Sequence, residues 1–363
     1  MSKHLVLLGG GHANLHVLEA LAHDPLEDCK VTLVSPWCGQ IYSGMLPGWV
    51  AGHYRLDECQ IPLDQLAAAA GADFLHTPAC SIDANHRRIC LGGGNTISYD
   101  VLAVDIGSAI RTDAILCEPE YVVPVRPAQL FAERYRRFVC TGDSGPIAVV
   151  GGGMGSVELA CALRAGLGQG IEITAFVGRS GLVPSHPRPL RARLLHTLQN
   201  RDVAVITDEV RRVDATHVET RAGRRFPTSF VVLATGPQAP HLLHGSGLKL
   251  DSAGYLKVDA CLRSLSHPDV LAAGDCASLP FDKITRSGVY AVRQGSVLAR
   301  NIRAVMTTGV LHRFRPQRRA LYLISTGTRH AIGTWGPWSF QGEWVWKWKD
   351  LIDRQFVRRF SAY

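Results

Sequence analysis

The sequence has no apolar run that approaches the roughly 18 residues of a membrane-spanning helix. Its ten cysteines include no C-x-x-C or C-x-x-x-x-C pair, so neither a zinc ribbon nor a local redox dithiol is signalled, and no metal site is expected. No secretory signal is expected either, because the first apolar stretch runs straight into a glycine turn. These absences predict a cytoplasmic protein with reduced thiols, most of them small core residues.

What is present describes a globular chain. Of its 363 residues 46% are hydrophobic and 19% charged, which excludes a disordered protein, a collagen-like chain and a disulfide miniprotein. The length is sufficient for two domains. The net charge of +8 is uneven: residues 311–363 hold ten Lys and Arg against three acids, +7, which leaves +1 for the rest. Five of the seven tryptophans lie in the same tail. We therefore expect no nucleic acid partner for the body of the protein.

Two segments share one supersecondary pattern. In the first, an apolar strand over His4–Leu8 is followed by a glycine turn, a helix over Asn14–Ala22 and a strand over Val31–Val34. This is a parallel βαβ unit of about 30 residues. The second unit has strands over Ile147–Val150 and Ile171–Val177 with a helix over Ser156–Ala165 between them. Two such units far apart in the chain predict two nucleotide-binding folds.

The first glycine turn has the context that makes a dinucleotide fingerprint informative. Gly9 permits the tight turn, Gly11 lets the backbone approach a pyrophosphate, and the following helix offers free N–H groups. Asn14 occupies the third glycine position, and Ser35 stands where an acidic ribose ligand is usual. A plain structural βαβ turn is the alternative at this point.

The second turn, from Gly151 to Ser156, keeps a small residue at the third position. Its second strand ends in Gly-Arg179 with no carboxylate for a ribose 2′-OH, and an arginine there suits the 2′-phosphate of NADPH. A solvated loop charge is the alternative for Arg179.

Three further strands end in glycine. Two of them, at Gly107 and Gly236, follow the βαβ units. The third, over Val270–Ala273, ends in Gly274-Asp275, where backbone N–H groups can meet a phosphate while the carboxylate accepts from a ribityl hydroxyl. A helix cap is the alternative for this aspartate.

As an ordered set, these elements resemble the two-dinucleotide-binding flavoprotein reductases, also called pyridine nucleotide–disulfide oxidoreductases. The resemblance implies an α/β fold of two Rossmann-like domains. FAD would bind a discontinuous domain at residues 1–112 and 243–320, NADH or NADPH an inserted domain at 113–242, and residues 321–363 would form an amphipathic interface segment. The implied FAD contacts are Gly9, Gly11, His12, Ala13, Asn14, Ser35, Pro47, Gly107, Gly274 and Asp275. The implied nicotinamide cofactor contacts are Gly151, Gly153, Met154, Gly155, Ser156, Arg179 and Gly236.

Within that family the chain is most similar to the type II NADH dehydrogenases and to the dehydrogenase-like domain joined to some selenide, water dikinases. The phrases YSGMLPGWVAGHY and LISTGTRHAIG carry the second likeness. The sequence has no closely spaced pair of cysteines after the first βαβ unit, so a dithiol acceptor is not expected. It also has no cysteine beyond the Gly-Asp motif, which disfavours a sulfide:quinone reductase. The quinone-site pattern keeps Gln294 but has Val289 where glutamine is usual.

The resemblance implies a hydride transfer from NAD(P)H to FAD and onward reduction of a quinone or other small acceptor, with Glu158 and Gln294 as the expected catalytic residues. For Glu158, a simple acid favoured near a helix N-terminus is the alternative. A flavin-binding redox sensor with little turnover is the alternative function.

The tail predicts an amphipathic helix. Trp344, Trp348, Ile352, Phe356 and Phe360 recur at four-residue spacing, with basic residues away from them. Such a helix suits the inner face of a cell membrane, the protein's own core or a partner such as a second copy.

Overall fold

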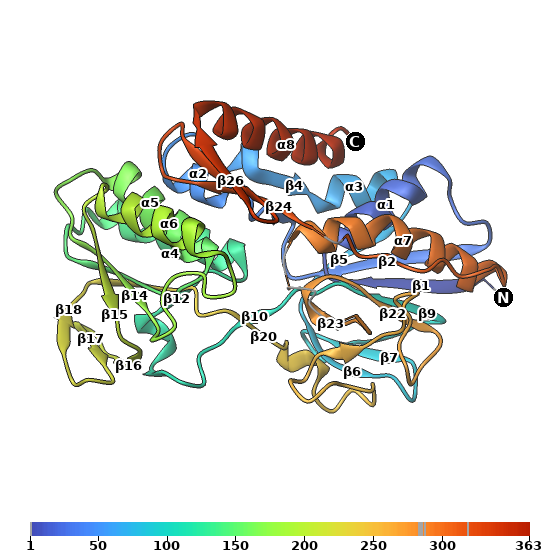
Figure 1. The fold of residues 1–363 in the computed structure, drawn as a ribbon. Helices are drawn as coiled ribbons and strands as arrows, with labels where there is room; N and C mark the ends of the chain where they lie inside the picture. Colours follow the sequence, from blue (N-terminus) through green and yellow to red (C-terminus); the bar gives the residue numbers. More distant parts are fainter. Residues whose placement is uncertain (1, 282–285, 287, 318) are drawn as a thin grey trace.

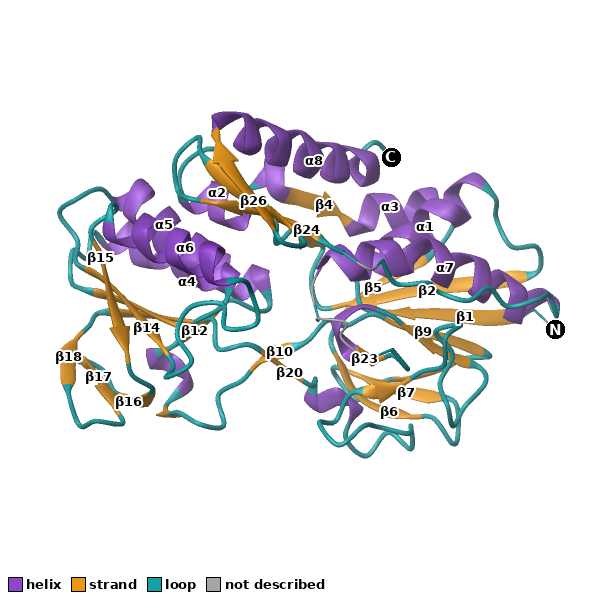
Figure 2. Ribbon diagram, viewed as in Figure 1, coloured by secondary structure: helices purple, strands orange, loops and turns teal. Residues whose placement is uncertain are grey.

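The computed structural model describes residues 2–281, 286, 288–317 and 319–363. Figures 1 and 2 show two α/β lobes side by side, joined by a narrow crossing below and bridged above by the C-terminal segment. The fold class predicted from the sequence is confirmed.

The first lobe is built on a five-stranded parallel sheet in the order β22-β9-β1-β2-β5. Its strands are β1 (Lys3–Leu8), β2 (Cys29–Ser35), β5 (Asp73–His76), β9 (Val101–Val104) and β22 (Val270–Ala272). The helices α1 (His12–His23), α3 (Leu63–Ala69) and α7 (Gly288–Thr307) lie above this sheet in Figure 1. The small sheet of β6 (Ala79–Asp83), β7 (Arg88–Leu91) and β8 (Thr96–Ser98) lies below it.

Both faces of the central strand β1 are therefore buried. Leu5 and Leu7 belong to the core under the helices, while Val6 and Leu8 pack with the small sheet. This explains why β1 is continuously apolar rather than alternating, as is usual for a parallel sheet covered on both faces.

The second lobe repeats this architecture with the sheet β12-β19-β13-β14-β15. Its strands are β12 (Val123–Pro124), β13 (Ile147–Val150), β14 (Ile173–Val177), β15 (Val203–Thr207) and β19 (Phe230–Leu233). The helices α4 (Ala128–Thr141), α5 (Met154–Leu167) and α6 (Arg188–Gln199) cover one face. The other face packs on β11 (Leu116–Cys117), β16 (Val210–Val213), β17 (His217–Thr220) and β18 (Arg225–Pro227).

The two lobes are joined where β10 (Ala109–Ile110) pairs antiparallel with β20 (Pro237–Gln238). Gly107 and Gly236 stand just before these strands with φ of +68° and +105°. Backbone of this kind favours glycine, so both residues turn the chain out of one sheet and into the other. The exact domain boundaries predicted above stay a prediction.

The C-terminal segment connects both lobes. The antiparallel sheet of β24 (Leu321–Ser325), β25 (Ala331–Trp335) and β26 (Trp338–Gly342) leads into α8 (Glu343–Ser361). β24 contacts α5 of the second lobe, while α8 contacts β4 (Gln60–Pro62) of the first. In Figure 1 α8 lies across the top of the molecule, above α2 (Leu46–Val50) and β4.

The observed helices begin earlier than predicted. Helix α1 begins at His12 rather than Asn14, and α5 at Met154 rather than Ser156, because Gly11 and Gly153 are the N-caps. Strand β14 begins at Ile173, two residues later than expected.

Candidate active site

The first glycine turn is closely packed against the strand beside it. Gly9 has φ of +90°, and a Cβ on it would lie 2.4 Å from the backbone oxygen of Asp105. The N–H of Gly11 donates to that same oxygen at 3.2 Å. Only glycine fits at position 9, which places the N-terminus of α1 at the carboxyl end of the sheet, where dinucleotides bind in open α/β folds.

Sequence reasoning missed Asp105, which follows β9. This residue is only 2% exposed, and its Oδ2 accepts from the N–H groups of Ala13 at 2.7 Å and Asn14 at 3.1 Å. Burial raises the pKa of the Asp105 carboxyl to about 7, against the lowering effect of those two N–H donors. The signal was an acid interrupting the apolar stretch VLAVDIG.

Asn14 holds the turn to the sheet instead of allowing the close approach of a third glycine. Its Nδ2 donates to the carbonyl of Gly9 at 2.8 Å, and the residue is fully buried. Its Oδ1 and the Nε2 of His12 are buried polar atoms without a hydrogen-bond partner in the part of the chain that the structure describes. Such atoms usually have partners, so the turn fits a ligand that supplies them.

The Gly-Asp motif lies beside this turn. Gln294 is 2% exposed, and its Oε1 accepts from the N–H of Gly274 at 2.7 Å. The side chain thus supports the motif; its predicted contact with an acceptor stays a prediction. Asp275 forms an ion pair with Arg126 at 2.8 Å, a partner that sequence reasoning missed. A cavity of about 250 Å³ runs along Gly274 and Asp275.

Two other predicted FAD contacts, Ser35 and Pro47, are engaged or buried within their own segments of the chain. The Ser35 hydroxyl donates to the carbonyl of Trp37 at 3.1 Å and accepts from its N–H at 3.2 Å. This hydroxyl is therefore engaged within its own turn. Pro47 is buried in the first turn of α2. Their predicted cofactor contacts stay predictions.

The second glycine turn is open where the first is covered. A Cβ on Gly151 would lie 2.2 Å from the backbone oxygen of Ala234, so this glycine is required for packing. By contrast, Gly153 and Gly155 are exposed, and a Cβ on either would have nothing within 4 Å. Ser156 donates to the carbonyl of Gly153 at 2.6 Å and holds the turn at the start of α5. The open space suits the pyrophosphate of a second dinucleotide.

The strand ends beside this turn carry charges of opposite sign. Arg179 is exposed just after β14, and its predicted phosphate contact stays a prediction. Glu209, which follows β15, was missed: its Cγ would lie 3.8 Å from a Cβ on Gly178, and its carboxylate pairs with Arg221 at 2.9 Å.

Glu158 lies on α5, where the two lobes and the tail meet. Its Oε1 accepts from the backbone N–H of Ser325 in β24 at 2.8 Å. Burial raises the pKa of the Glu158 carboxyl to about 7, while the Lys349 ammonium of α8 lowers it. Lys349 is 9% exposed and pairs with Asp353, which is 5% exposed, at 2.5 Å. A proton-carrying carboxyl therefore stands beside a buried ion pair.

An aromatic group adjoins this cluster. The ring of Tyr42 stacks on Phe356 of α8 with centroids 4.6 Å apart, and Phe356 stacks on His12 at 5.4 Å. Burial lowers the pKa of His12 to about 4, so its imidazole is neutral at pH 7. The tail thus contacts the residue that opens α1 in the first glycine turn.

The comparisons with known proteins agree with this geometry. Residues 3–295 match the family described as pyridine nucleotide-disulphide oxidoreductase. The chain belongs to this family. The membership predicted from the glycine turns and the Gly-Asp motif is confirmed, as is the similarity to NADH dehydrogenase-like proteins.

The relatives of this chain are distant in sequence. NADH dehydrogenase-like protein Rv1812c of Mycobacterium tuberculosis is 27% identical over 246 residues, covering 62% of this chain but only 60% of the relative. Demethylphylloquinone reductase NdbB of Synechocystis sp. is 22% identical over 291 residues, covering 75% of this chain and 71% of the relative. The structure of NDH2 from Plasmodium falciparum in complex with NADH has a TM-score of 0.81 at 14% identity, covering 100% of this chain and 98% of that one. This last likeness shows a shared fold.

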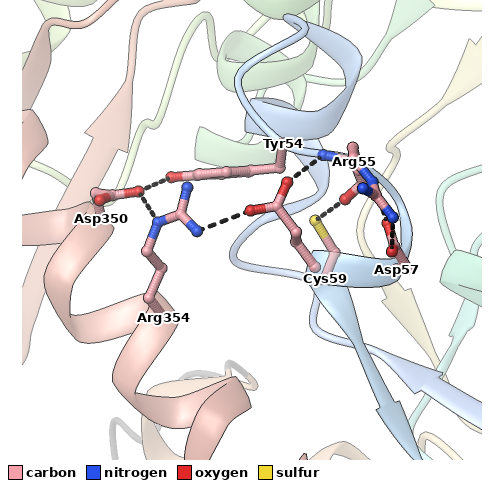
Figure 3. A network of polar contacts seen from close by, with 7 residues as sticks. Tyr54, Arg55, Asp57, Cys59, Asp350 and Arg354 are labelled. Carbon is pink, nitrogen blue, oxygen red and sulfur yellow. Dashed lines mark hydrogen bonds and ion pairs between the residues drawn. The ribbon is translucent and has the colours of Figure 1, made fainter.

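A polar network holds α8 against the first lobe (Figure 3). The hydroxyl of Tyr54 donates to Asp350 at 2.7 Å, and Arg354 donates to Asp350 at 3.0 Å and to Glu58 at 2.9 Å. The Arg354 guanidinium also lies over the Tyr54 ring, 4.9 Å from its centroid. The helix is therefore a docked part of the fold.

The predicted helix is confirmed as α8, but the predicted aromatic stripe does not keep to one side of it. The buried side chains are Val345, Lys349, Asp353, Val357 and Phe360. Of the predicted stripe, Phe360 is buried and Phe356 half-buried, whereas Trp344, Trp348 and Ile352 are exposed. A four-residue spacing drifts around a helix that has 3.6 residues per turn, so one stripe runs from solvent into the core.

Proposed function

We propose that this chain is an FAD-dependent oxidoreductase that takes a hydride from NADH or NADPH and delivers the electrons to a quinone or another small, non-disulfide acceptor. The difference between its two glycine turns carries the proposal. The first is enclosed by Asp105, the Gly-Asp motif and the tail, which suits a resident cofactor. The second is open at Gly153, which suits a dinucleotide that binds and leaves.

FAD, when bound, supplies the chemistry of accepting a hydride and releasing electrons to an acceptor. His12 and Asn14 offer it polar atoms that lack other partners in the described structure, and the N-terminus of α1 offers backbone N–H groups. A relative of this chain is a demethylphylloquinone reductase, which supports a quinone as acceptor.

The cysteines support an acceptor other than a disulfide. All ten are free thiols, and only Cys59, Cys161 and Cys276 are buried, so the prediction that most of them are core residues is wrong. Cys38, the cysteine that follows the first βαβ unit, is exposed, and its Sγ lies 3.3 Å from Nδ1 of His76. Because the sequence places a single cysteine directly after the first βαβ unit, we propose that no dithiol relay operates there.

Glu158 is the residue we propose to supply a proton to the acceptor. Reduction of a quinone to a quinol takes up two electrons and two protons. The hydride taken from NAD(P)H accounts for both electrons and one proton, so one further proton must be supplied. A carboxyl with a pKa of about 7, raised by burial, holds a proton at neutral pH and can release it, as general acids do. Lys349 stands close enough to stabilise the carboxylate that remains.

Glu158→Gln is expected to lower kcat with a soluble quinone on the order of 100-fold, because an amide cannot release the proton. The amide oxygen still accepts from Ser325, so the fold is kept. With ferricyanide, which takes up electrons without protons, turnover should match the wild type. The wild-type rate with quinone should fall as pH rises through about 7, and the variant should lose that dependence. An equal loss with both acceptors would contradict the proton role.

The choice of nicotinamide cofactor depends on two charges. Arg179 supports NADPH because a guanidinium can pair with a 2′-phosphate, whereas Glu209 supports NADH because a carboxylate accepts from a ribose 2′-OH. Both residues follow neighbouring strands at the same edge of the sheet. We therefore propose that both cofactors serve as donors.

We propose that the exposed tryptophans of the tail bind an anionic membrane surface on the cytoplasmic side. None of the helices in the described part of the chain is long and apolar enough to cross a membrane. The tail nevertheless exposes a group of large apolar side chains, the tryptophan face: Trp335, Trp338, Trp344, Trp348, Leu351 and Ile352. Basic residues adjoin it, with Arg319 lying 5.7 Å from the ring centroid of Trp335. Tryptophan beside basic charge is typical of interfacial helices.

Flotation with vesicles tests this surface. The wild type should float with phosphatidylglycerol-containing vesicles and less so in high salt, and Trp344→Ala/Trp348→Ala should remain at the bottom. Leu116→Ala, which removes an exposed apolar side chain from the second lobe, should float like the wild type. Loss of a dimer in sedimentation, with vesicle binding unchanged, would instead assign the tryptophan face to a second copy.

Steady-state NAD(P)H oxidation tests the proposed activity. With soluble quinones we expect turnover, whereas disulfides such as oxidised glutathione should give none. If the flavin is reduced quickly but no acceptor restores it, the chain acts as a redox sensor and the enzyme proposal is wrong.

A further inference from the structure

Asp105 lies at the first glycine turn, where the proposed cofactor would bind. Its Oδ2 accepts hydrogen bonds from the N–H groups of Ala13 and Asn14, which are two of the donors at the N-terminus of α1. Donors at this position are the usual ligands of a dinucleotide pyrophosphate. The protein thus presents a carboxylate of its own to part of the phosphate-binding backbone.

The same carboxyl group reaches the second phosphate-facing motif. A Cβ on Gly274 would lie 2.5 Å from Oδ1 of Asp105, and a Cβ on Gly11 would lie 2.4 Å from either carboxylate oxygen. Asp105 is therefore wedged between the first glycine turn and the Gly-Asp motif. Both glycines leave room for this side chain rather than for the ligand alone.

We propose that Asp105 makes FAD binding proton-linked: the carboxyl takes up one proton from solvent when the diphosphate binds. The inference rests on FAD as the proposed cofactor. A carboxylate beside a diphosphate is repelled, because like charges in a buried site disfavour one another. A protonated carboxyl instead still accepts from α1 through one oxygen and can donate to a phosphate oxygen through the other.

The titratable groups around Asp105 are paired or neutral, so we assign the proton to Asp105. From η4 (Gly274–Cys276), Asp275 is paired with Arg126, and burial raises the pKa of the Cys276 thiol. From α1, His12 is neutral because burial lowers its pKa to about 4. The Asp105 carboxyl has its pKa raised by burial to about 7, so at pH 8 and above it is ionised in the free protein and must gain a proton on binding.

Asp105→Asn copies the protonated state, because an amide keeps one acceptor oxygen and gains N–H donors. We would measure the FAD dissociation constant of apoprotein by flavin fluorescence from pH 6 to 9. For the wild type it should rise towards tenfold per pH unit above about 7, whereas for Asp105→Asn it should be nearly flat. At pH 9 the variant should bind at least 10-fold more tightly, and at pH 6 within threefold of the wild type. Asp64→Asn, an exposed acid on α3, should follow the wild type.

Calorimetry of the wild type alone provides a second readout. Binding heats measured at pH 8 in HEPES and in Tris should differ by the amount expected for uptake of close to one proton. Equal heats in the two buffers, or the same pH dependence in Asp105→Asn as in the wild type, would overturn the inference. A wild type that binds no FAD at any pH would instead overturn the proposed cofactor.

Discussion

Gly153→Val is expected to weaken NAD(P)H binding on the order of 100-fold, about 2.8 kcal/mol, while leaving FAD bound. Gly153 has an extended backbone with φ of −81°, and a Cβ on it has nothing within 4 Å. Valine therefore fits the free protein without strain but fills the space into which the pyrophosphate backbone must come. The rate of flavin bleaching against NADH concentration measures the change.

A matched glycine tests whether the loss of NAD(P)H binding is specific to position 153 or follows from replacing any exposed glycine by valine. Gly170 is also exposed with open space around its Cβ, but it lies beyond α5 and away from the glycine turn. Gly170→Val should bind NAD(P)H as the wild type does. If Gly153→Val also binds NAD(P)H normally, the second turn is not the nicotinamide site.

Lys349→Met is expected to lower the free energy of unfolding by about 3–5 kcal/mol. The change leaves Asp353 buried without its cation, next to Glu158, and removes the bond from Nζ to the carbonyl of Gly44 at 2.7 Å. Denaturant unfolding at pH 8 measures the loss.

The double variant Lys349→Met/Asp353→Leu should regain most of that stability, since replacing both members of a buried pair by apolar residues is often neutral. If the single and double variants lose equal amounts, packing of the lysine stem rather than the charge anchors α8. If neither loses stability, the tail is not held by this pair.

Much of the fold was accessible from the sequence because its signals are local. Glycine turns between apolar strands and amphipathic helices depend on residues that are close along the chain, and β1, α1, β13 and α5 all lie where those signals placed them. Element ends were less accurate. The helix starts at His12 and Met154 were missed because a glycine N-cap leaves no side-chain signal.

The parts that sequence reasoning missed depend on contacts between distant residues. Asp105 meets the first turn 91 residues away at Asn14, and Arg126 meets Asp275 across 149 residues. Nothing local predicts these distances. An acid inside an apolar strand end is nevertheless a signal, because burial of a carboxylate is costly without partners.

The tail shows a third kind of limit. Its helix was predictable, but its orientation was not, because aromatic residues occur around most of its circumference. The buried Lys349 and Asp353, which read as solvent-facing residues, decide which face packs on the body. A hydrophobic pattern identifies the buried face of a helix from its apolar residues alone. It therefore misses a face that is buried through an ion pair.

The most direct test of the account is an anaerobic titration of the FAD-loaded protein with NADH and with NADPH, followed by addition of a soluble quinone. We predict that the oxidised flavin absorbance bleaches with close to one equivalent of either donor and returns when the quinone is added. A flavin that stays oxidised in excess NADH and NADPH would contradict the proposed function.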